Sequence, residues 1–279
     1  MTKILHSNEA LALREITKKF RSESGLEVVA LDRVSLVLKE GEFLSVVGPS
    51  GCGKSTLINI IAGLTDGYEG ERLINGEKVS GTHYDIGMVF QEESNFPWRT
   101  TLQNVAFGLE VAGTPRKERE EIARHLIHMI GLDGFEDVYP AELSGGMRQR
   151  VALARTLAVK PKILLLDEPF GALDEQTRIL LGDQLLRIWE ELKQTTLLVT
   201  HSITEAVQLS TRVALMTYRP GRIRAVIDVD LPRPRSSDVV ASEEFGRLTG
   251  RIWKELRTEA SRGLTHDEEE LRRRTHVSH

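Results

Sequence analysis

The chain has little cysteine, few aromatic residues and no long hydrophobic run. Cys52 is its single cysteine, so no internal disulfide can form and nothing indicates an oxidising compartment. The N-terminus, Met1-Thr2-Lys3, lacks the apolar stretch of a signal peptide. No segment reaches the ~18 consecutive apolar residues of a membrane-spanning helix. From these absences we expect a cytoplasmic chain that does not itself cross a membrane.

Neither sign of charge dominates the sequence. It has 37 Lys and Arg residues against 41 Asp and Glu residues, which gives a net charge of −4. A protein that wraps nucleic acid usually has a basic surplus, so we expect no nucleic-acid partner. The 279 residues, of which 40% are hydrophobic, suffice for one large globular domain with a subdomain or a tail.

Hydrophobic periodicity predicts an alternation of strands and helices. Short apolar runs at 43–47, 163–166 and 196–200 are typical of buried strands, and helical patterns at 56–61 and 177–193 lie between them. Such an alternation predicts an α/β fold with a doubly wound, mainly parallel sheet.

An antiparallel β subdomain is predicted at the N-terminus. Apolar and polar residues alternate at 10–20 and 28–38, and residues 70–90 hold two more short strands around the turn Asn75-Gly76. We therefore expect a second, antiparallel sheet beside the parallel one.

Two mostly helical regions complete the chain. Residues from about 92 to 155 predict an inserted helical subdomain, with helices at 116–130 and 144–158. After a break at 231–235, which contains Pro232 and Pro234, we expect one amphipathic helix over 242–261 and then a charged tail at 267–274.

A phosphate-binding loop follows the strand 43–47. The segment Gly48-Pro49-Ser50-Gly51-Cys52-Gly53-Lys54-Ser55 fits G-x-x-x-x-G-K-[ST], and a helix that includes Thr56 comes next. Its glycines let backbone N–H groups surround phosphate oxygens, and the helix adds its positive end. We expect Lys54 to reach the β- and γ-phosphates and the Ser55 hydroxyl to bind Mg²⁺. The alternative is a plain glycine-rich turn.

Two acids end the strand Ile163–Leu166. Asp167 would lie on the phosphate side of the sheet and hold Mg²⁺ directly or through water. Glu168 would orient and deprotonate the attacking water. The alternative is that both acids are ordinary turn residues.

A second phosphate-binding feature lies at Ser144-Gly145-Gly146, within Leu143 to Arg150. Ser144 is a good N-cap, and the two glycines leave backbone amides exposed at the positive end of a helix. One nucleotide cannot easily use both features of one subunit. We therefore expect a head-to-tail dimer, in which each phosphate loop faces the Ser-Gly-Gly helix of the other subunit. An ordinary capped helix is the alternative.

The phosphate loop, the LSGGMRQR segment and the LLLDEP segment together resemble the ATP-binding subunits of ABC transporters. The resemblance covers residues 10–230, which correspond to the nucleotide-binding domain, and leaves 236–279 as the C-terminal helix and tail. It implies a P-loop ATPase that binds ATP and Mg²⁺ and hydrolyses ATP.

Further residue roles follow from the resemblance alone. It implies that Gln91 touches Mg²⁺ and senses the membrane partner, and that Asp174 crosses the dimer interface. His201 would contact the γ-phosphate, and Phe20 would stack on adenine. Each residue has an alternative as a loop, structural or core side chain. The place of Cys52 beside Lys54 and a helix N-terminus favours its thiolate, so we expect thiol reagents to inactivate the protein and ATP to protect it.

Three short segments indicate one subgroup of the ABC transporter subunits. Residues 95–100, 200–206 and 219–223 are similar to those of the nitrate/sulfonate/taurine importer ATPases, as are the unusual Met147 and Ser202. This similarity implies a bacterial importer subunit at the cytoplasmic face of the inner membrane, working as a homodimer or with a close paralogue.

The same similarity implies two further partners. A separate permease would dock near Gln91 to Arg99, where exposed Phe96 and Trp98 would anchor it, unless both are buried in the helical subdomain. A periplasmic or lipid-anchored substrate-binding protein would deliver a small solute such as nitrate, a sulfonate or taurine.

Two other function classes remain open. A non-transport ABC ATPase would act on DNA or ribosomes, but DNA-repair relatives carry a very long coiled coil where this chain has only 89 residues between Lys54 and Ser144. Ribosome-acting relatives carry two cassettes, and this chain has one. A scaffold that binds ATP without turnover is disfavoured by the presence of Asp167, Glu168 and His201.

Overall fold

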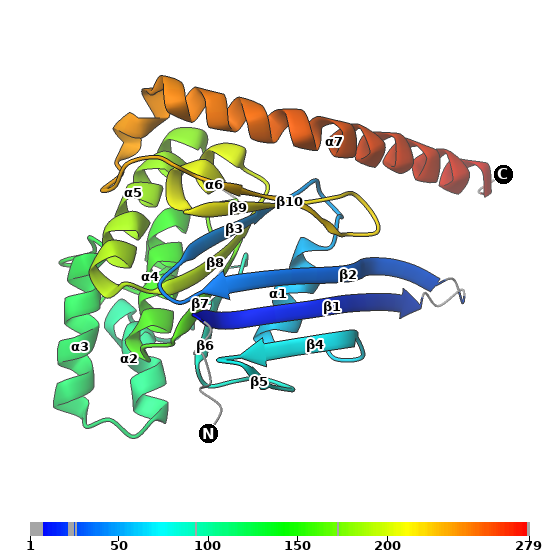
Figure 1. Cartoon of the computed structure of the whole chain (residues 1–279). Helices are drawn as coiled ribbons and strands as arrows, with labels where there is room; N and C mark the ends of the chain where they lie inside the picture. The colour runs from blue at the N-terminus through cyan, green and yellow to red at the C-terminus, as the bar shows by residue number, and fades with distance from the viewer. Residues whose placement is uncertain (1–7, 22–24, 26, 93, 172, 278–279) are drawn as a thin grey trace, which may run out of the picture.

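The structure is a computed structural model that describes residues 8–21, 25, 27–92, 94–171 and 173–277. Its elements form two sheets, a group of helices at one side and a long C-terminal helix (Figure 1). Glu93 of the expected docking segment, Ala172, which is two residues before the expected interface residue Asp174, and residues 278–279 of the tail lie outside the described residues.

The predicted antiparallel sheet is confirmed. Its strand order is β2-β1-β4-β5, and every neighbouring pair is antiparallel. At the predicted turn, Asn75 and Gly76 have φ angles of 51° and 81°, the left-handed pair that a tight hairpin requires. The strands span β1 Glu9–Arg21, β2 Glu27–Lys39, β4 Glu69–Ile74 and β5 Glu77–Lys78.

A six-stranded sheet forms the centre of the protein, in the order β10-β9-β3-β8-β7-β6. All its pairs are parallel except that of β10 with β9. Every residue of β3, β7 and β8 is buried, as expected for strands covered on both faces. The strands span β3 Phe43–Val47, β6 Ile86–Val89, β7 Ile163–Asp167, β8 Thr195–Thr200, β9 Arg212–Met216 and β10 Ile223–Asp228.

Helices cover both faces of this sheet, so the doubly wound α/β prediction is confirmed. One core lies between α1, the antiparallel sheet and the parallel strands, and a second lies under α4 and α5. A third joins α6, β9, β10 and α7. The helices span α1 Lys54–Ala62, α2 Thr101–Val111, α3 Arg116–Met129, α4 Gly145–Ala158, α5 Glu175–Leu192 and α6 Ile203–Leu209, with 3₁₀ turns η1 Pro140–Glu142 and η2 Ser237–Ala241.

The C-terminal helix α7 is longer than the sequence predicted. It spans Glu243–Val277 and runs past the sheets in Figure 1, so the helix does not end at Ser261 before a separate tail. The charged stretch contains a signal for this, because Glu268 to Glu270 stand four residues before Arg272 to Arg274, a spacing that favours helix. Among the described residues, no helix is long and apolar enough to cross a membrane.

Candidate active site

The phosphate loop connects β3 to α1, as predicted. Gly53 is the N-cap of α1 with a φ of 101°, a conformation open mainly to glycine. A Cβ at this position would lie 2.9 Å from the Ala30 carbonyl oxygen, so strand β2 presses closely on the loop. The turn at Gly53 therefore brings the positive end of α1 to the phosphate loop.

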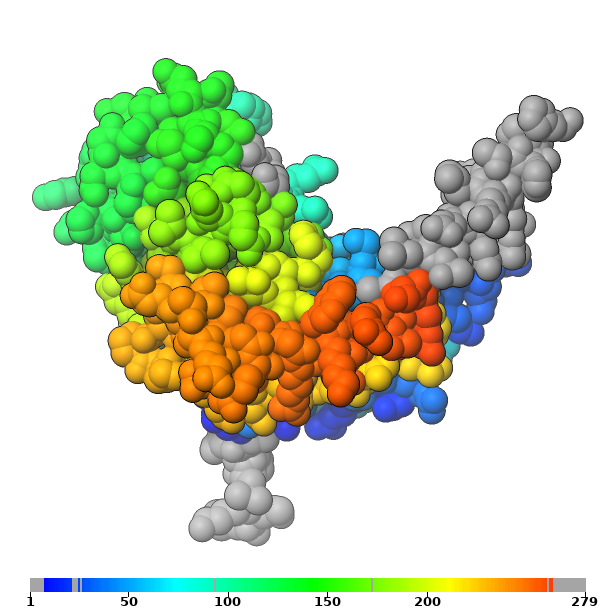
Figure 2. All heavy atoms as spheres, turned by 90° about the horizontal axis from the view of Figure 1, so that it is seen from above, coloured from blue at the N-terminus to red at the C-terminus, as the bar shows by residue number. Residues whose placement is uncertain are grey.

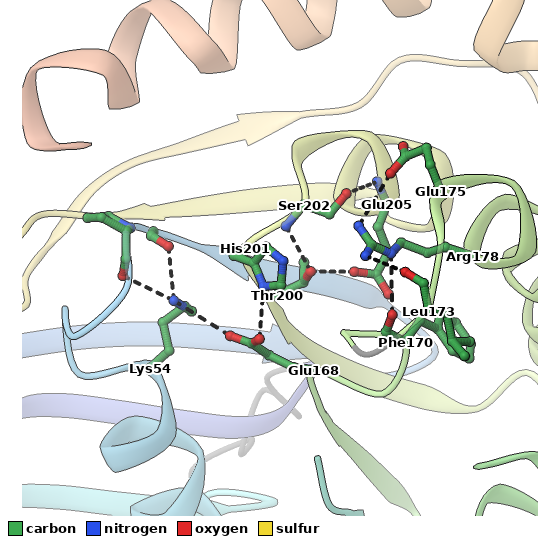
Figure 3. Close-up of polar contacts among 12 residues, drawn as sticks. Lys54, Glu168, Phe170, Leu173, Glu175, Arg178, Thr200, His201, Ser202 and Glu205 are labelled. Atoms are coloured by element: carbon green, nitrogen blue, oxygen red, sulfur yellow. Dashed lines mark hydrogen bonds and ion pairs between the residues drawn. The ribbon is translucent and has the colours of Figure 1, made fainter. Parts of the chain in front are cut away.

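The Lys54 ammonium lies inside this loop. Only 6% of Lys54 is exposed, and its Nζ donates to the carbonyl oxygens of Gly48 at 2.9 Å and Pro49 at 3.1 Å. The same atom lies 3.8 Å from Oε1 of Glu168 (Figure 3). The sheet thus brings together a cation and a carboxylate that are far apart in the sequence.

Glu168 and His201 form a pair across neighbouring parallel strands. Glu168 follows β7 and His201 follows β8, and the Glu168 N–H donates to the Val199 carbonyl oxygen at 2.8 Å. His201 Nδ1 lies 2.8 Å from Oε2 of Glu168, at hydrogen-bond distance. Glu168 has a φ of 44°, which is uncommon outside glycine and is typical of strained functional positions. The carboxylate is therefore oriented by both Lys54 and His201.

Asp167, the last residue of β7, has an unpaired oxygen. It is 7% exposed, and its Oδ1 has no hydrogen-bond partner among the described residues. Burial raises the pKa of Asp167 to about 6, with a further increase from the charge of Glu168 and a decrease from Lys54. A cation beside this oxygen would compensate its burial, so Asp167 fits the expected Mg²⁺ ligand.

The remaining expected Mg²⁺ ligands are neutral. Ser55 and Gln91 line one cavity, which Asp167 itself does not line, and the described residues contain no group of three or more His, Cys, Asp or Glu side chains that could form a metal cage. This donor set suits Mg²⁺, which typically takes one or two carboxylates and completes its shell with phosphate oxygens and water.

Most of the predicted nucleotide-binding side chains surround one cavity of about 470 Å³. The predicted members of its lining are Phe20, Ser50, Gly51, Gly53, Lys54, Ser55, Thr56, Gln91 and Glu168. Gly48, Pro49, Cys52, Asp167 and His201 do not line it, although Gly48 and Pro49 hold Lys54 and His201 contacts Glu168. Phe20 is 46% exposed at this cavity, and Lys18 Nζ lies 4.9 Å from its ring centroid.

Arg219 lines the cavity but was not predicted as a site residue. It lies in the loop between β9 and β10, and its Nε donates to the Gly51 carbonyl oxygen at 2.9 Å. The sequence contains a signal, since Arg219-Pro220-Gly221 is a turn with a basic residue. Only the pairing of β9 with β3 shows that this turn meets the phosphate loop.

The expected interface residues lie away from this cavity. Ser144 caps α4, where its hydroxyl accepts the Met147 N–H at 3.3 Å, and neither Gly145 nor Gly146 lines the cavity. Asp174 caps α5, which begins two residues before the predicted start at 177. The Asp174 Oδ1 accepts the Thr177 N–H at 2.9 Å. Within one subunit, these groups do not share the Lys54 cavity.

The prediction that Cys52 is a reactive thiolate is wrong. The side chain of Cys52 is fully buried, and burial raises its pKa despite the opposing charge of Lys54. A Cβ on Gly48 would lie 2.8 Å from its Sγ, so the thiol points into the packed side of the loop. Cys52 is a small core residue here, and its thiol is shielded from reagents.

Comparison with known proteins gives the family. The family described as ABC transporter matches residues 31–171. An uncharacterized ABC transporter ATP-binding protein of Methanocaldococcus jannaschii is 52% identical over 245 residues, which cover 88% of this chain and 91% of that protein. This chain belongs to the ABC transporter ATP-binding family. It is therefore an ATPase of the ABC type, as the motifs predicted.

Other members of the ABC transporter family support this placement. The aliphatic sulfonates import ATP-binding protein SsuB of Bacillus licheniformis is 47% identical over 250 residues, which cover 89% of this chain and 95% of that protein. An ATP-binding cassette solved as a dimer in a post-hydrolysis state with ADP and Pi has a TM-score of 0.69 at 34% identity, covering 80% of this chain and 100% of that one. A subunit of the cbiONQ complex of Clostridium perfringens has a TM-score of 0.72 at 26% identity, covering 86% and 94%.

Proposed function

We propose that this ABC ATPase powers a bacterial importer, and that the cavity around Lys54 is its ATP site. The observation that carries the proposal is the row of contacts from Lys54 to Glu168 and from Glu168 to His201, in which a carboxylate lies between the lysine of the phosphate loop and a histidine. Lys54 would bind the β- and γ-phosphates. Glu168 would accept a proton from the water that attacks the γ-phosphate, while His201 holds the carboxylate in place.

Mg²⁺ would be held by Asp167, Ser55 and Gln91. When bound, it would neutralise charge on the β- and γ-phosphates. The unpaired Asp167 Oδ1 and the two cavity-lining neutral groups support this assignment. Phe20, which lines the same cavity and is 46% exposed, would stack on the adenine ring.

A head-to-tail dimer would complete each site. Ser144, Gly145 and Gly146 present a capped helix N-terminus away from their own cavity, so they would reach a nucleotide only in the other subunit. Asp174 would lie at the same interface. The related cassette solved as a dimer supports this arrangement. ATP binding would close the dimer, and hydrolysis would reopen it.

The segment after Gln91 would receive the permease. Trp98 is 70% exposed and lines a surface cavity of about 440 Å³ with Arg99 and residues of α2 and α3. Phe96 instead packs on Phe107, with ring centroids 4.5 Å apart, so only one of the two expected aromatic anchors is presented. This position would place the protein on the cytoplasmic face of the membrane as a peripheral subunit.

The proposed cargo is a small solute of the nitrate, sulfonate or taurine class, delivered by a binding protein. Relatives named for the import of aliphatic sulfonates favour a sulfonate. The residues described here form the motor, and the permease and the binding protein would select the solute.

ATP hydrolysis by site variants tests the proposed chemistry. We expect Glu168→Gln to bind ATP but to hydrolyse it at least ~100-fold more slowly, because the general base is lost. Lys54→Ala should lose ATP binding itself. Glu71→Gln, which removes a half-exposed carboxylate from β4, is the control and should keep the parent rate. Hydrolysis at the parent rate by Glu168→Gln would show that Glu168 is not the base.

A further inference from the structure

The loop that joins β9 to β10 forms one wall of the nucleotide cavity. Arg219 lines the cavity and donates from Nε to the Gly51 carbonyl oxygen at 2.9 Å. The Gly221 N–H donates to the Ala30 carbonyl oxygen, also at 2.9 Å, which ties the loop to β2. A Cβ on Gly221 would lie 2.3 Å from the Cys52 carbonyl oxygen, so the loop packs directly on the phosphate loop.

The C-terminal helix α7 lies against the opposite side of this region. Its buried residues Phe245, Ile252 and Leu256 share a core with α6 and β9. In Figure 2, the first part of α7 crosses over the segments of α6 and β9–β10. The helix therefore reaches the base of the β9–β10 loop from outside the nucleotide-binding core.

Glu259 connects α7 to that loop. It is 1% exposed, and its Oε2 accepts the Tyr218 N–H at 3.0 Å. Its Oε1 accepts from Arg224 Nη1 at 3.0 Å and from Arg262 Nη1 at 3.1 Å. Tyr218 directly precedes Arg219. A charged hydrogen bond from the helix thus fixes the backbone next to the arginine of the cavity wall.

The buried Glu259 carboxylate accepts hydrogen bonds from three donors and so restrains the residues around it. Removing it would leave Arg224 without its buried partner and would remove the hydrogen bond to the Tyr218 N–H, at a cost larger than that of a surface ion pair. Arg219, one residue further on, would then lose one of the contacts that hold its backbone beside Gly51.

We propose that α7 sets the affinity for ATP: Glu259 positions the Tyr218–Arg219 backbone, and Arg219 contacts the bound nucleotide. The inference rests on the proposed function, because it takes the cavity as the ATP site. A guanidinium beside the phosphate loop is suited to hydrogen-bond phosphate oxygens. The C-terminal helix then acts on the active site, and displacing it from α6 weakens nucleotide binding.

The test is ATP binding and steady-state hydrolysis by full-length variants. We expect Arg219→Ala and Glu259→Ala each to raise the Kd and the KM for ATP about tenfold, with kcat within about twofold of the parent. The double variant should bind no more weakly than Arg219→Ala, because Glu259 acts through Arg219. Glu255→Ala is the matched control. It removes a half-exposed carboxylate of α7 that bonds Arg224 at 3.2 Å, and it should bind ATP like the parent.

Different results separate the two proposals. Additive losses in the double variant, an unchanged Kd in Arg219→Ala, or a loss confined to kcat would overturn the role of α7. Failure of the parent to bind ATP, or parent-like binding by Lys54→Ala, would instead overturn the assignment of the cavity. Thermal unfolding checks each variant, and Glu259→Met, which fills similar space without an oxygen acceptor for the Tyr218 N–H, replaces Glu259→Ala in the same double-variant comparison if the latter does not fold.

Discussion

At the scale of single residues, Glu205 is a buried carboxylate next to the site, where it bonds Thr200, the residue before His201. It lies on α6 with 4% exposure, and its Oε2 accepts a hydrogen bond from the Thr200 hydroxyl (Figure 3). Its Oε1 has no partner among the described residues. Burial raises the pKa of Glu205 to about 7; the Thr200 bond and the charge of Arg178 lower it, while Glu168 and Glu175 raise it.

This raised pKa predicts a pH-dependent stability. The pKa of Glu205 is about 7 in the folded state and 4.5 ordinarily, so the folded state binds the proton more tightly than the unfolded state does. Protonated Glu205 therefore stabilises the fold at low pH, and this stabilisation is lost as the pH rises through 7. The uncharged Glu205→Gln variant escapes this loss. We expect its free energy of unfolding, relative to the parent, to rise by on the order of 3 kcal/mol between about pH 5 and pH 8. Urea unfolding at both pH values measures it.

A control and a contrary result complete this experiment. Glu175→Gln, whose side chain is 56% exposed, should keep a nearly constant difference from the parent across the same pH range. A difference between Glu205→Gln and the parent that does not change with pH would show that Glu205 titrates normally in the fold.

Cys52 and Arg219 mark the limit of residue-level prediction. Strand–loop–helix geometry predicted the place of Lys54, the strand that ends in Asp167 predicted that of Glu168, and the family resemblance predicted that of Gln91; all three line one cavity. The direction of the Cys52 side chain and the approach of Arg219 depend on how β9 and β10 pack, which no local pattern encodes.

At the scale of elements, Arg235 anchors the segment before α7 to the end of α6. It is 7% exposed, and its guanidinium donates to five carbonyl oxygens. Three of them, on Val207, Gln208 and Ser210, belong to the C-terminal end of α6, where a cation is favoured. The other two belong to Val229 and Leu231.

Removing this anchor should destabilise the protein. We expect Arg235→Ala to lower the free energy of unfolding by about 3 kcal/mol, because buried carbonyl groups lose a charged donor. Arg247→Ala, which removes a 70% exposed arginine from α7, should change stability by less than about 0.5 kcal/mol. Urea denaturation compares them, and equal effects of the two substitutions would contradict the anchoring role.

Elements with a local signal were predicted, and those without one were not. The antiparallel strands, β3, β7, β8, α3 and α4 follow from periodicity and caps. The short helix α6 has only seven residues, too few to show a period. Burial alternates along the edge strand β10, but its sequence does not, because the exposed Val226 is apolar. Tertiary pairing decides both.

At the scale of the whole molecule, the separation of the two phosphate-binding features has a direct test. We expect Glu168→Gln with ATP and Mg²⁺ to elute as a dimer in size-exclusion chromatography, since bound nucleotide would join each phosphate loop to the Ser144 helix of the other subunit. Adding Ser144→Arg to this variant should give a monomer, as should omission of ATP. A monomeric elution of ATP-loaded Glu168→Gln would break the head-to-tail arrangement.

The pairing of β7 with β8 makes the distance between Glu168 and His201 independent of the length of the connection between the two strands. Glu168 and His201 keep their spacing through strand register, while the chain between them passes through α5 and turns at Lys193, an exposed left-handed position. Such turns are where proteins accept added residues. A reporter peptide inserted after Lys193 would therefore leave the proposed catalytic pair Glu168 and His201 in register, which makes this turn a suitable place to attach a label to the ATPase.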